Sequence, residues 1–247
     1  MRQNRAKTSD YPKLGSFRQT TPRPLAPAPD FWPAILPPAA CRTYNIHMKL
    51  IAALLAAMLP CLAASPSADK NKVLGSANAP VTIEIFSDYG CPMCKRFHQE
   101  ELPLLMRDYV VSGKVRIISR EFPLNIPAHK YSREAANYAT AAARIGAAQY
   151  DAVANVLFQE QESWETSGKV WETVSSVLTP EQQKKVKSLV GDSSVIDEVQ
   201  ADVDYGTAGG INGTPTLFVE KGSKRYPATG GVLAYNLLKG LIDDLLK

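Results

Sequence analysis

Two cysteines separated by two residues, Cys91 and Cys94 in FSDYGCPMCKRFH, are the residues of this sequence best suited to chemistry. Such a pair can be a redox dithiol, part of a metal site or two small buried apolar residues. The other two cysteines, Cys41 and Cys61, both lie in the first 64 residues. The choice among these possibilities depends on the elements around the pair.

The stretch before the pair predicts a strand, and the stretch after it predicts a helix. Apolar residues alternate in the β-branched APVTIEIFSDY at 79–89, and they recur at helical spacing from Pro92 to Gly113. Cys91 therefore lies at the N-terminus of a helix, where free backbone N–H groups and the helix dipole favour the thiolate. Pro92 suits the first turn because it lacks an N–H that would have no partner there.

The two cysteines can close a disulfide without unwinding the helix, because Cys94 lies one turn further along and points back toward Cys91. The pair can then accept or donate two electrons by exchange through a mixed disulfide. We expect Cys91 to be the attacking sulfur and Cys94 to be the less exposed one.

A metal site and a purely structural disulfide are the weaker interpretations of the pair. Zinc needs three or four ligands, and only His98 and His129 accompany the cysteines beyond residue 64. A disulfide that closes so small a loop adds little to the stability of a fold. We therefore expect no metal, and we interpret His98 as a solvated helix residue and His129 as a loop residue.

The rest of the chain predicts two strand-containing segments around an all-helical block. Strands are expected at KVRIISREF, TPTLFVE and RYPATG, and a terminal helix is expected at AYNLLKGLIDDLLK. The block at 127–206 holds short helices, one capped by Ser132 and another started by Thr179 and the proline after it. Pro103 is expected to bend the helix that follows the cysteine pair.

The charge distribution separates the first 64 residues from the remainder. They carry eight of the 28 Lys and Arg residues and two of the 24 Asp and Glu residues. The remainder has 20 basic and 22 acidic side chains, a formal charge of −2, although the whole chain carries +4. Because the sequence has no basic stripe and no interleaved aromatic and basic residues, we expect no nucleic-acid partner.

The stretch MKLIAALLAAMLPCLAASPSA, from Met48, has the order of a secretory signal: one Lys, an apolar run and small residues. We expect a signal peptide at 48–64, cleaved near Ala63, because the apolar run is shorter than the ~20 residues of a membrane span. Residues 1–47 hold eight of the 18 prolines and no apolar period, which is typical of disorder. We interpret Met48 as the start of translation and residues 65–71 as a linker. Both N-terminal cysteines are then absent from the mature protein.

Three segments together resemble the DsbA-like branch of the thioredoxin superfamily, a group of exported thiol–disulfide oxidoreductases. They are APVTIEIFSDYGCPMCKRFH, the helical block, and INGTPTLFV with the strand and helix after it. The resemblance extends over 72–247. It implies an α/β thioredoxin-like fold with an inserted all-helical domain, in which 72–126 and 207–247 form the thioredoxin-like domain and 127–206 forms the insertion.

The resemblance also implies roles for residues outside the cysteine pair. In this family the proline that matches Pro215 is cis and faces the active-site disulfide. The residue before it, Thr214 here, offers backbone hydrogen bonds to an extended client segment. Pro92 and Met93 complete the active-site loop between the cysteines. A cis X–Pro bond is a minority state, so it usually marks a required geometry.

Two positions depart from the family's pattern. Strong oxidants of the family often have His as the second residue between the cysteines; Met93 stands there, so we expect a less extreme oxidant. The family often has a buried acid for proton transfer six positions before the first cysteine, where this chain has Ile85. Glu84 is one residue earlier and therefore on the opposite face of the strand, and Asp88 in the loop is an alternative.

The sequence therefore predicts an exported disulfide oxidoreductase that oxidises client dithiols through a Cys91–Cys94 disulfide. We expect it to be periplasmic or otherwise exported, and soluble after signal cleavage. The expected partners are unfolded or reduced exported proteins with cysteine pairs and, as the family implies, a quinone-linked membrane oxidase; no cofactor is expected. A reductase or isomerase is the alternative within the family, and a non-redox client-binding module is the alternative outside it. Isomerases usually carry an N-terminal dimerisation domain, but only about 15 residues separate the expected cleavage site from the first strand, so we expect a monomer.

Overall fold

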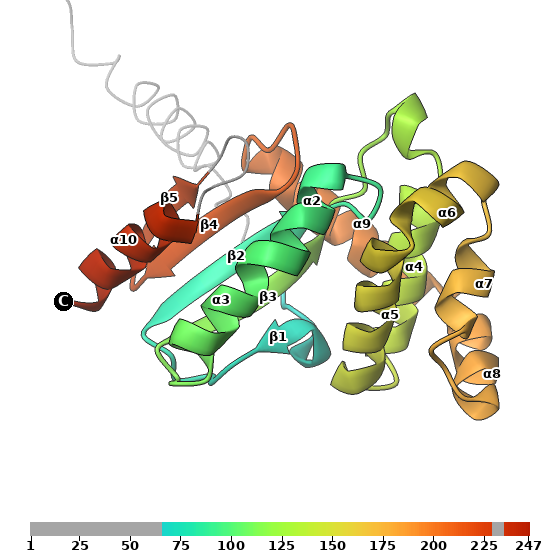
Figure 1. Ribbon diagram of the computed structural model, residues 1–247, viewed down its shortest axis with the longest axis horizontal. Coiled ribbons are helices and arrows are strands. Elements are labelled where there is room, and N and C mark those ends of the chain that lie inside the picture. The colour runs from blue at the N-terminus through green and yellow to red at the C-terminus, as the bar shows by residue number, and fades with distance from the viewer. Residues whose placement is uncertain (1–65, 229–234) are drawn as a thin grey trace, which may run out of the picture. The chain divides into compact units, whose positions relative to one another are not determined.

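A five-stranded mixed sheet forms the centre of the part of the chain that the computed structural model describes, residues 66–228 and 235–247. Its strands are β1 (Val73–Leu74), β2 (Val81–Ser87), β3 (Val115–Glu121), β4 (Thr216–Lys221) and β5 (Lys224–Ala228), in the spatial order β1-β3-β2-β4-β5. β2 pairs in parallel with β3 and antiparallel with β4 (Figure 1). The cysteine pair therefore follows the central strand of the sheet.

The strand predictions from the sequence are confirmed for β2, β3, β4 and β5. No sequence pattern predicts β1, because two residues are too few to show an alternation; its Val73 pairs antiparallel with Ile118. β2 is buried along nearly its whole length because helices cover both faces of the sheet.

One continuous helical segment follows β2 and carries the cysteine pair at its start. It consists of α2 (Pro92–Arg96), the π-helical η2 (Phe97–Glu101), α3 (Leu102–Leu105) and the π-helical η3 (Met106–Val110). Pro103 lies in the first turn of α3, directly after η2. The sequence predicts a bend at this proline, and the structure shows a change from π-helical to α-helical hydrogen bonding there.

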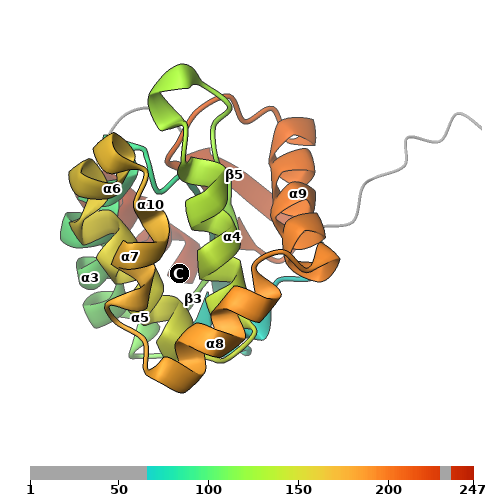
Figure 2. The same ribbon diagram turned by 90° about the vertical axis from the view of Figure 1, so that its right-hand side faces the viewer.

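The helical block lies between β3 and β4, as the sequence predicts. Its helices are η4 (Pro127–His129), α4 (Ser132–Ala143), α5 (Ala147–Gln159), α6 (Gln161–Ser167), α7 (Val170–Ser175), α8 (Pro180–Leu189) and α9 (Ser193–Ala208). Figures 1 and 2 show α4 to α8 grouped beside the sheet, whereas α9 returns along it toward β4. The predicted class, an α/β fold with an all-helical insertion, is confirmed.

Apolar cores lie on both faces of the sheet and inside the helical insertion. Ile83 and Ile85 face the core that η2 to η3 and the terminal helix α10 (Tyr235–Leu246) cover. The smaller core on the other face, against α9, consists of Phe86, Phe122, Ile211 and Phe218. The core of the insertion includes Cys91 and Cys94. The cysteine pair therefore packs against the insertion as well as standing at the end of the sheet.

Two predicted helix starts in the insertion have different outcomes. Thr179 caps α8 in a capping box with Gln182, so that prediction is confirmed. The prediction of a cap at Ser132 is wrong, because Ser132 is the first residue of α4 and makes no cap hydrogen bond. Its hydroxyl instead accepts a hydrogen bond from the backbone N–H of Gly90 at 3.2 Å. A tertiary contact has replaced the local one.

The N-terminal predictions meet the structure only in part. The disordered stretch at 1–47, the start at Met48 and the signal peptide at 48–64 lie outside the described residues. The segment predicted as a linker runs into a short 3₁₀ helix, η1 (Lys70–Lys72), and Asn71 donates to the carbonyl of Ala143 in the insertion at 2.8 Å. Over 66–228 and 235–247, no helix is long and apolar enough to cross a membrane.

Candidate active site

Cys91 occupies the N-cap position of α2, at the end of a short turn after β2. We call residues 88–91 the cysteine turn. The backbone N–H of Cys91 donates to the carbonyl of Asp88 at 3.1 Å, and the carbonyl of Cys91 accepts the first helical hydrogen bond, from Lys95, at 3.1 Å. Pro92 follows in the first helical turn, where a missing N–H has no cost. The Cys91 sulfur thus lies beside the free N–H groups of that turn.

The surroundings of Cys91 lower the pKa of its thiol from the ordinary 9.0 to about 5. The largest cause is a hydrogen bond from the Cys94 side chain. The Thr214 side chain and the backbone N–H groups of Cys94 and Met93 act in the same direction, and burial acts against them. Cys91 is therefore a thiolate at neutral pH in the reduced protein, and the thiolate is the nucleophilic form.

Cys94 lies one helical turn further on and is only 1% exposed. Burial first, and then the hydrogen bond and charge of Cys91, raise the pKa of Cys94 well above its ordinary value. The backbone N–H of Asp88 donates to its sulfur at 3.5 Å. Both cysteines are free thiols in this structure. Both side chains are buried, with 7% of Cys91 exposed, but the sulfurs differ in charge: that of Cys91 is ionised beside the helix end, and that of Cys94 is protonated.

Thr214 and Pro215 lie against the cysteine pair, although 123 residues separate Thr214 from Cys91. The peptide bond between Thr214 and Pro215 is cis, and the Cys91 sulfur is 3.3 Å from the carbonyl oxygen of Thr214. A cavity of about 420 Å³ adjoins them and is lined by 209–216, Phe218 and Pro227. The fold therefore brings together Cys91, Cys94 and the Thr-Pro segment that the sequence singles out.

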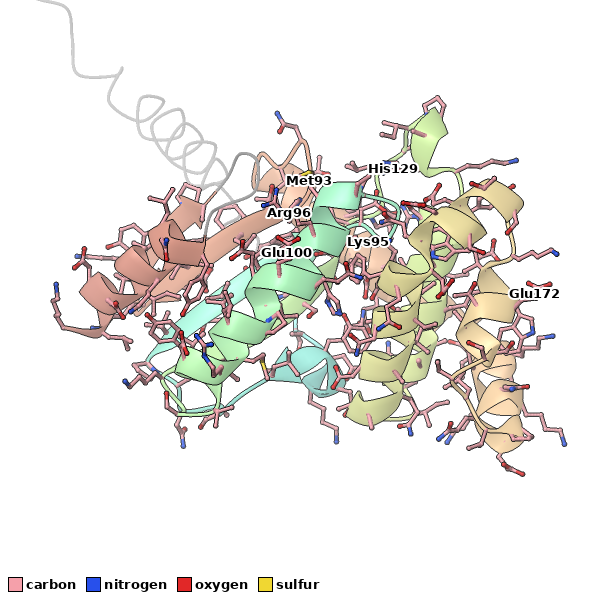
Figure 3. The ribbon with its side chains drawn as sticks, viewed as in Figure 1. Met93, Lys95, Arg96, Glu100, His129 and Glu172 are labelled. Carbon is pink, nitrogen blue, oxygen red and sulfur yellow. The ribbon has the colours of Figure 1, made fainter. Side chains whose placement is uncertain are left out.

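A buried carboxylate organises the cysteine turn. Asp88 is 1% exposed, and its oxygens accept hydrogen bonds from the backbone N–H groups of Gly90 at 2.8 Å and Leu124 at 2.9 Å. His129 Nδ1 donates to the same carboxylate at 2.6 Å. The prediction of His129 as a loop residue is therefore incomplete: it lies in η4 and holds the turn from the insertion (Figure 3).

Glu84 is bound on the face of the sheet away from α2. Its carboxylate lies 2.8 Å from Arg120 and 2.8 Å from Arg225. Ile85 faces the opposite side, in the core beneath the helical segment that continues from α2. Alternation along β2 thus separates the two side chains as expected. The ion pairs engage both carboxylate oxygens of Glu84.

Glu121 is a buried acid on the α2 side of the sheet that the sequence pattern does not reveal. It is 2% exposed, lies 3.4 Å from Lys72 Nζ and accepts a hydrogen bond from the Tyr150 hydroxyl at 3.5 Å. Burial raises the pKa of Glu121 to about 7, against the effect of Lys72. With Tyr89 and Tyr150 it lines a cavity of about 420 Å³ between the helical segment after β2 and α5.

His98 lies in η2 of the helical segment, as predicted, but it is half-buried rather than fully solvated. Its Nε2 lies 2.8 Å from Asn155 Oδ1, and its ring packs against Phe158 with centroids 4.6 Å apart. Burial lowers the pKa of His98. Within the described part of the chain, no group of three or more His, Cys, Asp and Glu side chains is placed to hold a metal ion.

The outer surface of α2 surrounds the entrance to Cys91. Pro92 is exposed, and Met93 is half-buried against the core of the insertion. Arg96 and Glu100 form an exposed ion pair at 2.9 Å one turn further on (Figure 3). The residues next to Cys91 on this surface are therefore apolar, and the charged pair lies one turn beyond them.

Comparison with known proteins agrees with this geometry. The protein-family model described as Thioredoxin matches residues 67–235. The chain is 28% identical over 159 residues to Disulfide bond formation protein D of Bacillus subtilis. That match covers 62% of this chain and 69% of the Bacillus protein.

Two solved structures have similar folds. The oxidised BdbD of Bacillus subtilis is 25% identical, with a TM-score of 0.60, over 71% of this chain and 92% of that one. The alpha-DsbA1 of Wolbachia pipientis is 22% identical, with a TM-score of 0.59, over 77% of this chain and 94% of that one. The second likeness concerns the fold alone. Both have the thioredoxin fold with an inserted helical domain.

Proposed function

We propose that this chain, which belongs to the thioredoxin family and is a DsbA-like thiol–disulfide oxidoreductase, oxidises the cysteine pairs of reduced client proteins after export. The observation that carries this proposal is the Cys91 thiolate at the N-terminus of α2, with a pKa of about 5 and Cys94 buried behind it. A stabilised thiolate stabilises the reduced protein. The reduction potential of the Cys91–Cys94 disulfide therefore rises, and the disulfide becomes a stronger oxidant.

Oxidation begins when a client thiolate attacks the Cys91 sulfur of the Cys91–Cys94 disulfide. The bond between the two cysteines breaks, a client–Cys91 disulfide forms, and Cys94 leaves with the electron pair and takes up a proton, as its raised pKa favours. The second client thiolate then attacks the client sulfur of the mixed disulfide, and Cys91 leaves as a thiolate. The client has lost two electrons and the protein has gained them. In the reverse direction, Cys94 resolves the mixed disulfide.

The strength of the oxidant follows from the pKa of Cys91. A pKa of about 5 lies two units below pH 7 and stabilises the reduced protein by about 2.7 kcal/mol, or about 60 mV. Thioredoxin, with a cysteine pKa of about 7, has a potential of about −270 mV, and DsbA reaches about −120 mV. Adding about 60 mV to the thioredoxin value places the reduction potential of this chain at about −210 mV. Met93, in place of the usual His, fits an oxidant of intermediate strength.

Client binding belongs to the segment around Pro215. We assign Thr214 the role of pairing its backbone with an extended client, because its carbonyl lies beside the Cys91 sulfur. The cavity that 209–216 help to line takes client side chains, and Pro92 and Met93 form the opposite rim. The thioredoxin-like domain at 72–126 and 207–247 thus supplies the cysteines and the groove, and the insertion at 127–206 covers the pair.

Export and regeneration complete the proposal. The signal-like stretch at 48–64 supports secretion to the periplasm or its equivalent. There the chain acts as a soluble monomer, and a membrane oxidase restores the Cys91–Cys94 disulfide after each client. N-terminal sequencing of the protein recovered from cells tests this part, and a mature protein that still begins before Met48 contradicts it.

The test of the activity is oxidation of a reduced, unfolded protein with one cysteine pair by a stoichiometric amount of the oxidised chain. Every sample carries Cys41→Ser and Cys61→Ser, so that only the pair under study reacts. We expect loss of client thiols with Cys91 and Cys94 present and no loss with Cys91→Ser. The variant Cys94→Ser is expected to accumulate more mixed disulfide with a disulfide-bonded client than the chain with both cysteines, because Cys94 no longer resolves it and only the second client thiol can.

Two outcomes contradict the proposal in different ways. Full client oxidation by the variant without Cys91 and Cys94 excludes a disulfide oxidoreductase that works through this pair. A non-redox client-binding module is then the remaining interpretation. A reduction potential near about −270 mV, measured against glutathione, assigns the chain to reduction or isomerisation rather than oxidation.

A further inference from the structure

Gln161, the first residue of α6, reaches out of the insertion into the cysteine turn. Its side chain is buried, with 4% exposed. Its Nε2 donates to the carbonyl of Tyr89 at 2.5 Å and to the carbonyl of Cys91 at 3.1 Å. A side-chain amide nitrogen carries two hydrogens, so these two carbonyls use its full donor capacity.

The other groups of the cysteine turn are also held. The N–H of Gly90 lies between the Asp88 carboxylate at 2.8 Å and the Ser132 hydroxyl at 3.2 Å. The ring of Tyr89 packs against Phe158, with centroids 4.8 Å apart. Gln161 supplies the hydrogen bonds on the carbonyl side of the turn, and these bonds flank Cys91 itself.

We propose that Gln161 is a positioning residue for Cys91: by binding the carbonyls of Tyr89 and Cys91, it fixes the backbone that aims the Cys91 sulfur at the N-terminus of α2. The insertion thereby helps to set the chemistry of a cysteine that belongs to the thioredoxin-like domain. This inference rests on the proposed role of Cys91 as the sulfur that exchanges with clients.

Gln161 can affect the Cys91 thiolate because it fixes the orientation of the peptide groups around it. The carbonyl of Cys91 accepts from both Gln161 and the N–H of Lys95, so its orientation is fixed from two sides. The N–H groups of Met93 and Cys94, which stabilise the thiolate, follow directly in the same turn of helix. Loss of Gln161 leaves two buried carbonyls without this donor, and the turn shifts to reach water or another donor.

Gln183 is a matched control, because its side chain also donates two hydrogen bonds to backbone carbonyls but lies away from Cys91. The Nε2 of Gln183 donates to the carbonyls of Ser175 at 2.9 Å and Leu178 at 3.0 Å, also within the insertion. Gln161→Met and Gln183→Met therefore remove the same pair of bonds at two places. Methionine keeps an unbranched side chain of similar length.

The experiment measures two properties of the reduced full-length chain that carries Cys41→Ser and Cys61→Ser. The first is the pH at which half of Cys91 is ionised, from the ultraviolet absorbance of the thiolate. The second is the equilibrium in which two glutathione thiols reduce the protein disulfide to Cys91 and Cys94 thiols and become glutathione disulfide. Neither measurement requires a client, so failure here is distinguishable from failure of the proposed function.

With Gln161→Met, we expect the ionisation midpoint of Cys91 to rise by about one pH unit, the size of one lost hydrogen bond to the thiolate. The equilibrium with glutathione then moves about tenfold toward the protein disulfide, or about 30 mV. Gln183→Met is expected to leave both values within about twofold of the unsubstituted chain. If Gln161→Met fails to fold, Gln161→Ala replaces it, since the smaller side chain leaves room for water at the two carbonyls.

The inference is overturned if the Gln161 variant lowers the free energy of unfolding but leaves the Cys91 midpoint and the glutathione equilibrium where Gln183→Met leaves them. Equal shifts in both variants also overturn it, because they show a general response to loosening of the insertion.

Discussion

Replacing Cys94 by Ala is expected to raise the pKa of Cys91, because the hydrogen bond from Cys94 is the largest cause of its low value. The variant removes the donor and also the sulfur that resolves mixed disulfides. Its effect on Cys91 is therefore measured without any exchange reaction, in the reduced chain with Cys41→Ser and Cys61→Ser.

The magnitude follows from the shift and the number of donors. A fall from 9.0 to about 5 corresponds to roughly 5 kcal/mol in favour of the thiolate. A hydrogen bond to a charged group contributes about 1.5–3 kcal/mol, so loss of the Cys94 donor raises the pKa of Cys91 by about one to two units. We therefore expect a midpoint between about 6 and 7 for Cys94→Ala.

Cys94→Ser is the matched control, since its hydroxyl keeps a donor at the same place. We expect a midpoint near that of the unsubstituted pair. The assay is the thiolate absorbance as a function of pH, checked by the pH dependence of alkylation by iodoacetamide. Identical midpoints for Ala and Ser at position 94, or a midpoint near 8.5 in the unsubstituted chain, refute the assignment of the low pKa to this hydrogen bond.

The same thiolate predicts how stability depends on pH. Because the folded pKa of Cys91 lies below its unfolded value, ionisation stabilises the reduced protein fully above about pH 9, and this contribution is lost as the pH falls to about 5. Relative to Cys91→Ser, the free energy of unfolding of the reduced chain is expected to rise by up to about 1.4 kcal/mol per pH unit across this interval. A difference in free energy of unfolding between the two chains that does not change with pH contradicts this prediction.

Three further substitutions test the surroundings of the pair. Gly90→Ala places a Cβ 2.4 Å from the Ser132 hydroxyl, so we expect a loss of about 1–3 kcal/mol in urea unfolding, and an unchanged midpoint contradicts the packing. Asp88→Asn leaves one acceptor oxygen for two backbone N–H groups and His129, so we expect the free energy of unfolding to fall by about 2–3 kcal/mol. His129→Gln removes only one of these hydrogen bonds and is the milder control. Equal losses of stability in the two variants refute this account. Glu121→Gln removes a carboxyl whose pKa rises from 4.5 to about 7 on folding, so its ionisation opposes folding increasingly above about pH 4.5 and fully above about pH 7. The stability of this variant relative to the unsubstituted chain is therefore expected to improve by roughly 3 kcal/mol between pH 4 and pH 8, and a constant difference opposes this reasoning.

The features that the sequence predicts correctly are those with local causes. The alternation in β2, the helical spacing after Pro92 and the capping box at Thr179 each involve residues within a few positions of one another. Cys91 at a helix N-terminus follows from the same local pattern, and so does the preference for its thiolate.

The errors and omissions concern residues whose partners are distant in the chain. The Ser132 hydroxyl turns to Gly90, 42 residues away, instead of capping its own helix. His129 binds Asp88 across 41 residues, and Gln161 binds Cys91 across 70. No pattern in one sequence encodes which loop a polar side chain meets after the chain has folded.

By itself, the sequence determined the chemistry of this protein: two thiols one helical turn apart, the first at the N-terminus of a helix, in a chain whose order of strands and helices fits one fold. Only the tertiary structure decided how that chemistry is set. It placed Thr214 beside the Cys91 sulfur, tied Glu84 into ion pairs on the other face, and closed the insertion over the cysteine turn. The physical reason is that a local pattern fixes backbone conformation, whereas the pKa of a buried thiol depends on every donor and charge that folding brings within a few ångströms.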